Sequence, residues 1–279
     1  MIPAGTVQGL WVKGPLSPME ELSVRSFLAQ GHGYDLYSYD DSLAVPAGAR
    51  LLPAAGVLDA GELRGDGSAA GSDSAFSNLF RFKLLYERGG WWADMDMICL
   101  RPLDLDGEHV FASERLPDGG ATITSGILKA PARSGVCAEC FERARRHERR
   151  AATPWGATGP ALLREVVERR GATGSVLAPE AFCPVDWWQA ETLLAPGEPP
   201  AGSYTIHLWQ EVWRRNGWPK EPVYPPPTLY QRLHQLLPHR RPDGVRRVGA
   251  ERGNGPRARR QGFISPDREE AAHGTRTRH

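Results

Sequence analysis

The sequence has no long apolar run, almost no net charge and few cysteines. No apolar stretch approaches the roughly 20 residues that a membrane-spanning helix needs. The first residues lack the basic and apolar segments of a secretory leader, so we expect a cytoplasmic protein. The formal net charge of +1 gives the chain no overall attraction to nucleic acid, and we expect no specific nucleic-acid partner.

The chain has four cysteines. Cys137 and Cys140 have the spacing of a metal or redox pair, but no second pair and no His motif completes a zinc site. Their surroundings are rich in Ala, Glu and Arg, which differs from the strand-to-helix start of thioredoxin-type sites. We interpret them as ordinary reduced thiols near a helix.

The first forty residues predict a strand, a helix and a second strand. Residues 7–12 are apolar, and Ser17 followed by Pro and two acids is typical of a helix start. Residues 34–39 predict the second strand. This order, in a chain of 279 residues, indicates an α/β fold in which helices cover a parallel or mixed sheet.

The remaining chain predicts the rest of the same domain and a tail. Residues 40–74 are expected to form connections with short elements. The clearest helix is 76–88, which Gly89-Gly90 ends, and residues 91–100 predict one continuous extended segment. Further strands are expected within 110–129 and helices at 136–150 and 160–170. We predict a globular domain over 1–238 and a basic, disordered tail over 239–279.

Asp94 and Asp96 carry the strongest chemical signal. On an extended backbone, carboxylates two residues apart point the same way, roughly 6–7 Å apart. A hard divalent ion such as Mg²⁺ or Mn²⁺ binds carboxylates together with phosphate oxygens, and this suits a diphosphate leaving group. The three residues alone are equally compatible with a solvated acidic strand end.

The run from Ser77 to Asp96, SNLFRFKLLYERGGWWADMD, resembles the signature of the DXD sugar-binding glycosyltransferases, the family 32 and α-1,4-glycosyltransferase group. The resemblance implies a GT-A fold, with a mostly parallel mixed sheet flanked by helices. It also implies metal-dependent transfer of a hexose, with retention, from a nucleotide sugar such as a UDP-sugar to a saccharide or glycoconjugate acceptor. Polysaccharide biosynthesis is the expected setting.

The resemblance also implies roles for single residues. Asn78, where the family commonly has Asp, and Arg81 would bind the donor sugar from one helical face. Asp94 would contact ribose and the metal, and Asp96 would be the direct metal ligand. The alternative for Arg81 is an ion pair with Glu87 or a nearby acid.

Four residues outside this run are further candidates. His207, at a predicted strand end, is the candidate third metal ligand, which favours Mn²⁺ over Mg²⁺; a structural hydrogen-bonding role is the alternative. Trp11 ends the first strand, where an indole can stack on the nucleotide base or belong to the core. Trp209 is a candidate contact of the acceptor. Gly126 would let a substrate approach the backbone, although a simple turn is the expected role.

Two other classes of protein use similar residues. A haloacid-dehalogenase-like phosphatase also has a D-x-D motif, but it needs a hydroxyl residue where Ile98 stands. A non-catalytic sugar-binding module would have no need of both acids and Arg81. We expect the enzyme, with a saccharide or lipid-linked glycan as acceptor. Peripheral contact with the inner face of a membrane, through that acceptor or the basic tail, follows as a further expectation.

Overall fold

The computed structural model describes residues 4–62, 73–148 and 158–237. The predicted tail, 239–279, lies outside these ranges, so its disorder and the domain boundary at 238 stay predictions. No helix within the described ranges is long and apolar enough to cross a bilayer.

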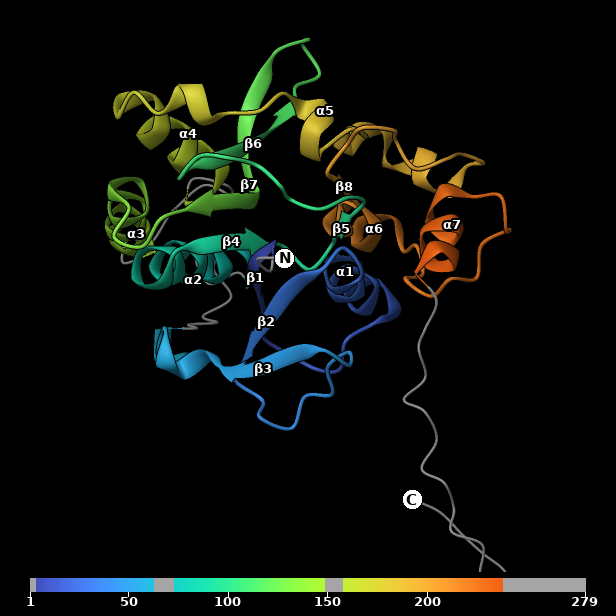
Figure 1. Cartoon of the computed structure of the whole chain (residues 1–279), viewed down its shortest axis with the longest axis horizontal. Coiled ribbons are helices and arrows are strands. Elements are labelled where there is room, and N and C mark those ends of the chain that lie inside the picture. The colour runs from blue at the N-terminus through green and yellow to red at the C-terminus, as the bar shows by residue number, and fades with distance from the viewer. Residues whose placement is uncertain (1–3, 63–72, 149–157, 238–279) are drawn as a thin grey trace, which may run out of the picture. The chain divides into compact units, whose positions relative to one another are not determined.

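A six-stranded sheet forms the centre of the fold (Figure 1). Its strand order is β3-β2-β1-β4-β7-β6. The first four of these strands run parallel, whereas β7 is antiparallel to both β4 and β6. The predicted fold class, a mostly parallel mixed sheet between helices, is confirmed. The strands are β1 (Ala4–Trp11), β2 (His32–Ser38), β3 (Ala49–Pro53), β4 (Gly90–Ala93), β6 (Val110–Arg115) and β7 (Ala121–Ala130).

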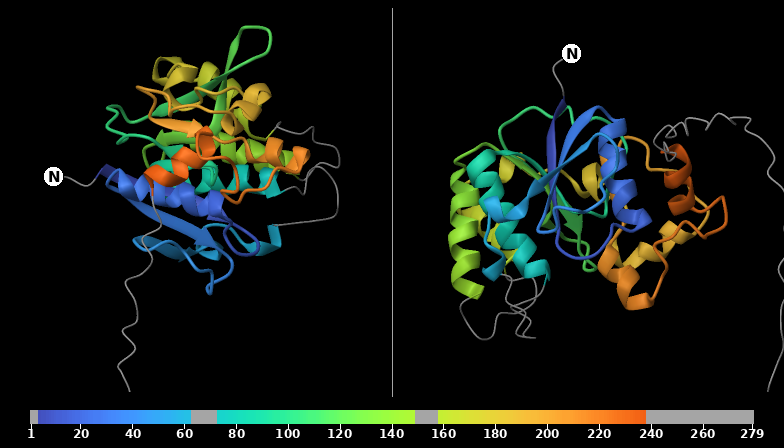
Figure 2. Two further views of the ribbon diagram at one scale, coloured as in Figure 1. Left: turned by 90° about the vertical axis from the view of Figure 1, so that its right-hand side faces the viewer. Right: turned by 90° about the horizontal axis from the view of Figure 1, so that it is seen from below.

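Helices cover both faces of this sheet (Figure 2). One face packs against α2, α3 and α4, and their apolar side chains form a shared core with the sheet. The opposite face packs against α1. The α-helices are α1 (Pro18–Ala29), α2 (Asp73–Arg88), α3 (Gly135–Glu148), α4 (Pro160–Arg169), α5 (Pro179–Phe182), α6 (Gln210–Asn216) and α7 (Leu229–Leu236). The short 3₁₀ segments are η1 (Ala54–Gly56), η2 (Ala60–Glu62), η4 (Thr173–Ser175) and η5 (Trp187–Leu194).

The helix signals in the sequence have the expected physical basis. Ser17 caps α1 and forms a capping box with Glu20, whose Oε2 accepts the Ser17 N–H at 2.7 Å. Gly89 and Gly90 both have positive φ, and a Cβ on Gly89 would lie 2.4 Å from a backbone nitrogen. Only glycine fits this turn without strain, so the chain leaves α2 sharply and enters β4. Cys137 and Cys140 are free, buried thiols on α3, as expected.

The prediction of one extended segment over residues 91–100 is wrong. β4 ends at Ala93, a turn follows at Asp94-Met95-Asp96, and β5 (Met97–Cys99) starts a second sheet. This two-stranded sheet pairs β5 antiparallel with β8 (Thr205–His207). The sequence alternates as a strand would, but its two halves hydrogen-bond to different sheets. The acidic residues therefore lie at a junction of two sheets rather than along one strand.

Two serines of α1 cover the backbone of β5. Ser23 Oγ donates to the carbonyl oxygen of Met97 at 2.7 Å, and Ser26 Oγ accepts the N–H of Cys99 at 2.7 Å. Both serines are buried. Buried backbone groups need such partners, so the serine hydroxyls act where a neighbouring strand would otherwise be required.

The connection predicted for residues 40–74 contains one strand of the main sheet. β3 pairs parallel with β2 from Tyr34↔Ala49 to Ser38↔Pro53, at the edge of the sheet. Its position at the edge, with half-exposed residues, explains why its apolar pattern is weak. Part of the predicted connection, residues 63–72, lies outside the described residues.

Candidate active site

The acidic turn is held by backbone hydrogen bonds from several elements. Met97 N–H closes it by donating to the carbonyl of Asp94 at 3.1 Å. Asp94 N–H donates to Gly126 O of β7 at 2.7 Å, and Leu208 N–H donates to Asp96 O at 2.9 Å. The turn is thus fixed both to the large sheet and to the residue that follows β8. Its two carboxylates consequently keep a defined relation to both sheets.

Arg81 of α2 holds the carboxylate of Asp94. Its Nη2 lies 3.0 Å from Oδ1, and its Nη1 lies 3.3 Å from Oδ2. Trp92 Nε1 also donates to Oδ1 at 2.9 Å, and the guanidinium lies 5.0 Å from the centre of the Trp92 ring. A bidentate pair of this kind fixes the orientation of the guanidinium relative to the carboxylate. Burial nevertheless raises the pKa of Asp94, against the opposing charge of Arg81.

Of the alternative partners for Arg81, Glu87 is wrong, whereas pairing with a nearby acid is confirmed by the contact with Asp94. Glu87 forms its ion pair with Lys83, at 3.7 Å. Arg81 instead extends its remaining donors to the hydroxyl of Ser77 and to the carbonyl of Ser125 on β7. The Arg81 side chain is 4% exposed. A buried cation with this many oxygen partners is locked in one orientation.

The carboxylate of Asp96 belongs to the other side of the site. Its Oδ2 lies 3.1 Å from His207 Nε2, and it accepts the backbone N–H of Gln210 at 2.8 Å. Burial acts to raise the pKa of Asp96, but the imidazole and the two hydrogen bonds outweigh it and lower the pKa. Burial likewise disfavours the charged imidazole, yet Asp96 raises the pKa of His207 well above its ordinary value. Both shifts favour an ionised pair.

An irregularity in β7 supplies the carbonyls that face the turn. Its pairing with β6 shifts, so that the four residues 124–127 lie opposite the single residue Ala112. This bulge presents the carbonyl of Ser125 to Arg81 and that of Gly126 to Asp94. The expectation of a simple turn at Gly126 is wrong, because Gly126 lies within β7. A Cβ there would lie 3.5 Å from His207 and 3.7 Å from Asp94 Oδ2.

Asn78 lies one helical turn before Arg81 and is buried like it. Its amide packs against Gly159, the residue that precedes α4, where a Cβ would approach Asn78 Nδ2 to 2.6 Å. The structure therefore places Asn78 and Arg81 on one side of α2, as predicted, and joins Asn78 to the start of α4. Its role in sugar binding stays a prediction.

The two candidate tryptophans occupy different places. Trp11 is half-buried at the end of β1, its Nε1 donates to Gly14 O at 2.8 Å, and Lys220 Nζ lies 6.0 Å from its ring. Trp209 lies at the acidic turn, with its ring centre 3.8 Å from that of His207. Trp209 also has a φ of 59°, a left-handed conformation that is costly outside glycine. This conformation starts α6 and directs the N–H of Gln210 to Asp96.

Several residues of the site give no signal in the sequence. Gln210 acts through its backbone, and Trp92 acts through an indole that could equally belong to the core. Glu114 of β6 is half-buried and hydrogen-bonded to Thr124, and burial raises its pKa although the charge of His207 opposes the shift. Its place near His207 depends on how β6 meets the small sheet, which no local pattern reveals.

The donor atoms of the turn suit a hard cation. Within the described ranges, no three His, Cys, Asp or Glu side chains are grouped as a complete metal site. Mg²⁺ and Mn²⁺, however, often take one or two carboxylates and complete their shell with water and substrate phosphates. Asp96 is kept ionised by its partners, and Asp94 lies two residues away. These two residues fit such a cation, whereas His207 Nε2 is directed to Asp96.

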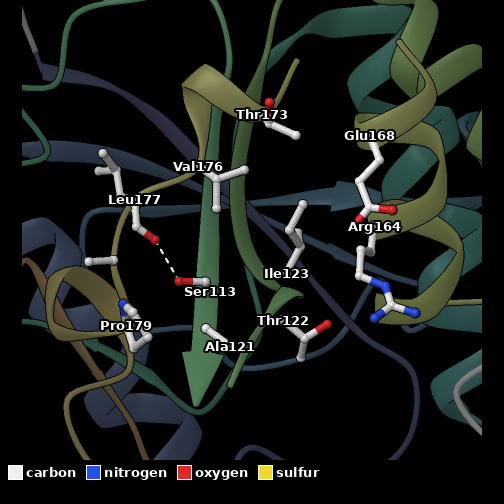
Figure 3. Close-up of a pocket in the computed structure, with 11 residues that line it drawn as sticks. Ser113, Ala121, Thr122, Ile123, Arg164, Glu168, Thr173, Val176, Leu177 and Pro179 are labelled. Atoms are coloured by element: carbon white, nitrogen blue, oxygen red, sulfur yellow. Dashed lines mark hydrogen bonds between the residues drawn. The ribbon is translucent and has the colours of Figure 1, made fainter. Parts of the chain in front are cut away.

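A separate pocket opens between the β6–β7 hairpin and α4 (Figure 3). Its volume is about 320 Å³, and none of the three residues Arg81, Asp94 and Asp96 lines it. Ser113 on its floor donates to the carbonyl of Leu177, which ties β6 to the segment before α5. Arg164 and Glu168 of α4 form its charged wall.

A comparison with protein families identifies the acidic turn as part of a known sequence motif. Residues 69–116 match the family described as "Glycosyltransferase sugar-binding region containing DXD motif". This stretch contains Arg81, Asp94 and Asp96, and it confirms the resemblance noted in the sequence. No curated protein matches the chain.

Three solved structures resemble the fold in part. The PaToxG glycosyltransferase is 9% identical, with a TM-score of 0.47 over 60% of this chain and 70% of that one. The ligand-free glycosyltransferase domain of the YGT toxin is 8% identical, with a TM-score of 0.44 over 62% and 79%. A structure described as a transferase mutant is 11% identical, with a TM-score of 0.39 over 59% and 84%.

Proposed function

We propose that this chain, which carries the DXD sugar-binding region of glycosyltransferases, transfers a hexose from a nucleotide sugar to a saccharide or glycoconjugate. A UDP-sugar is the proposed donor, and the reaction depends on a divalent cation, Mn²⁺ or Mg²⁺. The observation that supports this most is the acidic turn. There, Arg81 holds the carboxylate of Asp94, and His207 holds that of Asp96, two residues further on.

Asp96 is the proposed ligand of the cation. A bound divalent cation would neutralise the charge that develops on the diphosphate as the sugar bond breaks. His207 and the N–H of Gln210 hold the Asp96 carboxylate in place and keep it ionised. In this arrangement His207 positions a ligand. Ligation by His207 through Nε2, one form of the role expected from the sequence, would require Nε2 to turn away from Asp96.

Asp94 and Arg81 form the proposed donor-sugar contact. Asp94 would accept hydroxyl hydrogens of ribose or sugar and, directly or through water, would help Asp96 to hold the cation. Arg81 fixes Asp94 through two hydrogen bonds and offers positive charge near the diphosphate. Asn78 would donate to the sugar hydroxyls from the same side of α2, and Trp11 would stack on the base.

The chemistry relies on positioning and charge stabilisation. We assign no protein nucleophile. For transfer with retention, the departing diphosphate itself would guide the acceptor hydroxyl to the same face of the sugar. A cytoplasmic setting, a role in polysaccharide biosynthesis, and peripheral membrane contact through a lipid-linked acceptor belong to the proposal and rest on the sequence alone.

A panel of nucleotide sugars, with Mn²⁺ or EDTA, tests the proposal through release of nucleoside diphosphate. We expect release from at least one donor that depends on the cation and is lost in Asp96→Ala. Cys99→Ala is the matched control, because it changes a buried residue three positions away and keeps the backbone bond to Ser26. Sugar binding indifferent to EDTA would instead support a binding module, and phosphate release from monoesters would support a phosphatase.

A further inference from the structure

An exposed tryptophan pair lies on the segment between α5 and β8. Among the residues that the structure describes, three large apolar side chains are exposed, and Trp187, at 41%, is the aromatic one. Its ring centre lies 5.4 Å from that of the half-buried Trp188, with the planes at 89°. This edge-to-face pair keeps aromatic surface open to solvent. A single exposed apolar residue is normal on a protein surface. A function for this pair must therefore be argued from where the pair lies.

Two tethers place the pair beside the acidic turn. Val185, two residues before Trp187, accepts a hydrogen bond from Trp209 Nε1 at 2.9 Å. Trp209 in turn packs its ring on His207, the partner of Asp96. Asp186, which directly precedes Trp187, is bound by Arg115 of β6 at 3.0 Å. The tryptophan pair is therefore anchored to the residues that hold Asp96 and to β6.

Acidic, basic and amide groups lie on the segments next to the pair. Glu114 adjoins Arg115 on β6, and its carboxyl lies within the electrostatic reach of His207 and Asp186. Arg115 itself pairs with Asp186 and Glu180. Gln189 and Glu191 are exposed on the same 3₁₀ segment as the pair. An indole face beside such hydrogen-bonding groups suits a sugar ring, because the ring has an apolar C–H face and hydroxyls at its rim.

We propose that Trp187 and Trp188, with Glu114 towards the acidic turn, form the acceptor subsite for a saccharide of at least two sugar units. The proposed length rests on the chain of contacts, in which Val185, Trp209 and His207 connect the Trp187 segment to Asp96, so we assign separate sugar units to the two ends. The sugar that receives the hexose would meet Glu114, and the next unit would stack on Trp187. This proposal rests on the proposed transferase function.

Binding of defined disaccharides tests the subsite directly. We would measure lactose, maltose and N,N′-diacetylchitobiose against the full chain by saturation-transfer-difference NMR, and Mn²⁺–UDP binding by calorimetry. At least one disaccharide should bind, and Trp187→Ala should weaken it at least about tenfold, the size expected for loss of a tryptophan anchor. Trp187→Phe should restore most of the binding. Leu236→Ala, at an apolar residue on α7 that is 64% exposed, is the control and should change the binding of neither ligand.

The outcomes separate the two proposals. Absence of binding by all three disaccharides, or equal binding by Trp187→Ala and the unaltered chain, would overturn the acceptor subsite. Disaccharide binding that depends on Trp187, without any binding of Mn²⁺–UDP, would leave the sugar subsite standing and overturn the transferase proposal. Loss of binding to phosphatidylcholine vesicles in Trp187→Ala, with disaccharide binding unchanged, would identify a lipid contact and also overturn the subsite.

Discussion

Asp94 faces the large sheet and α2, whereas Asp96 faces the small sheet and α6. Asp94 has a fixed guanidinium, an indole N–H and the carbonyls of the β7 bulge around it, and its pKa is raised. Asp96 has a titratable imidazole and a backbone N–H, and its pKa is lowered. The two aspartates, two positions apart, therefore differ both in their partners and in the direction of their pKa shifts. The lowered pKa of Asp96 supports its proposed role as the cation ligand, because a cation needs the ionised form of the carboxylate.

The largest expected effect is on Asp96. Asp96→Asn keeps the shape of the turn but removes the negative charge, so cation-dependent release of nucleoside diphosphate should fall by roughly 1000-fold, equivalent to several kcal/mol of charge stabilisation. Calorimetry with Mn²⁺ should show the matching loss of affinity. If Asp94→Asn lost more Mn²⁺ affinity than Asp96→Asn, Asp94 rather than Asp96 would be the main cation ligand.

Arg81→Ala should have the next largest effect. The change leaves the Asp94 carboxylate without its cation, and breaking a buried pair typically costs about 3–5 kcal/mol; we expect the lower end, because the Asp94 side chain is 29% exposed. Urea denaturation measures this loss. Turnover should fall roughly 100-fold, as for removal of a preorganised donor. Lys83→Ala is the control, since Lys83 pairs with Glu87 on the same helix; an equal loss there would indicate damage to α2 in general.

His207→Gln should weaken Mn²⁺ binding about 10–100-fold, the range typical of residues that orient a metal ligand. Glutamine retains a donor that can reach Asp96, so a positioning role predicts a smaller loss than for His207→Phe. Identical losses in both variants would instead favour direct ligation by the imidazole. Thermal melting of both variants without metal provides the stability baseline.

Gly126→Ala should have the smallest effect. Its Cβ would meet neighbours at ordinary contact distances, so we expect a loss of stability below about 1 kcal/mol and a few-fold rise in the KM of the donor. Gly89→Ala is the contrasting substitution, because its Cβ would clash with backbone at a positive φ. There we expect roughly 1–3 kcal/mol of destabilisation, measured by urea denaturation. Equal effects at both glycines would contradict the assigned geometry.

Local patterns in the sequence account for much of the fold. The helix predicted over 76–88, the Gly89-Gly90 break and the helix start at Ser17 each depend on neighbouring residues, and the structure confirms all three. The placement of His207 at a strand end is also confirmed. These features are predictable because their physical cause lies within a few residues of chain.

The course of the chain through Asp94 and Asp96 could not be predicted in the same way. The alternating residues 91–99 suit a strand, and the break at Asp94 is set by hydrogen bonds to Gly126 and Leu208, which are far away in the sequence. The contact of Glu114 with Thr124 and the N–H of Gln210 at Asp96 also arise only in the folded chain. Tertiary partners decided the geometry that local periodicity left open.

The serine contacts between α1 and β5 have a mechanical consequence. A strand of three residues can shift easily, but here one side is paired with β8 and the other is fastened to a helix by two hydroxyls. α1 also connects β1 to β2, so the two hydroxyls join the scaffold that ends in Trp11 to the strand that follows Asp96. A change in either serine would therefore alter the link between the expected binding places of the base and of the cation, although neither serine is expected to contact a ligand.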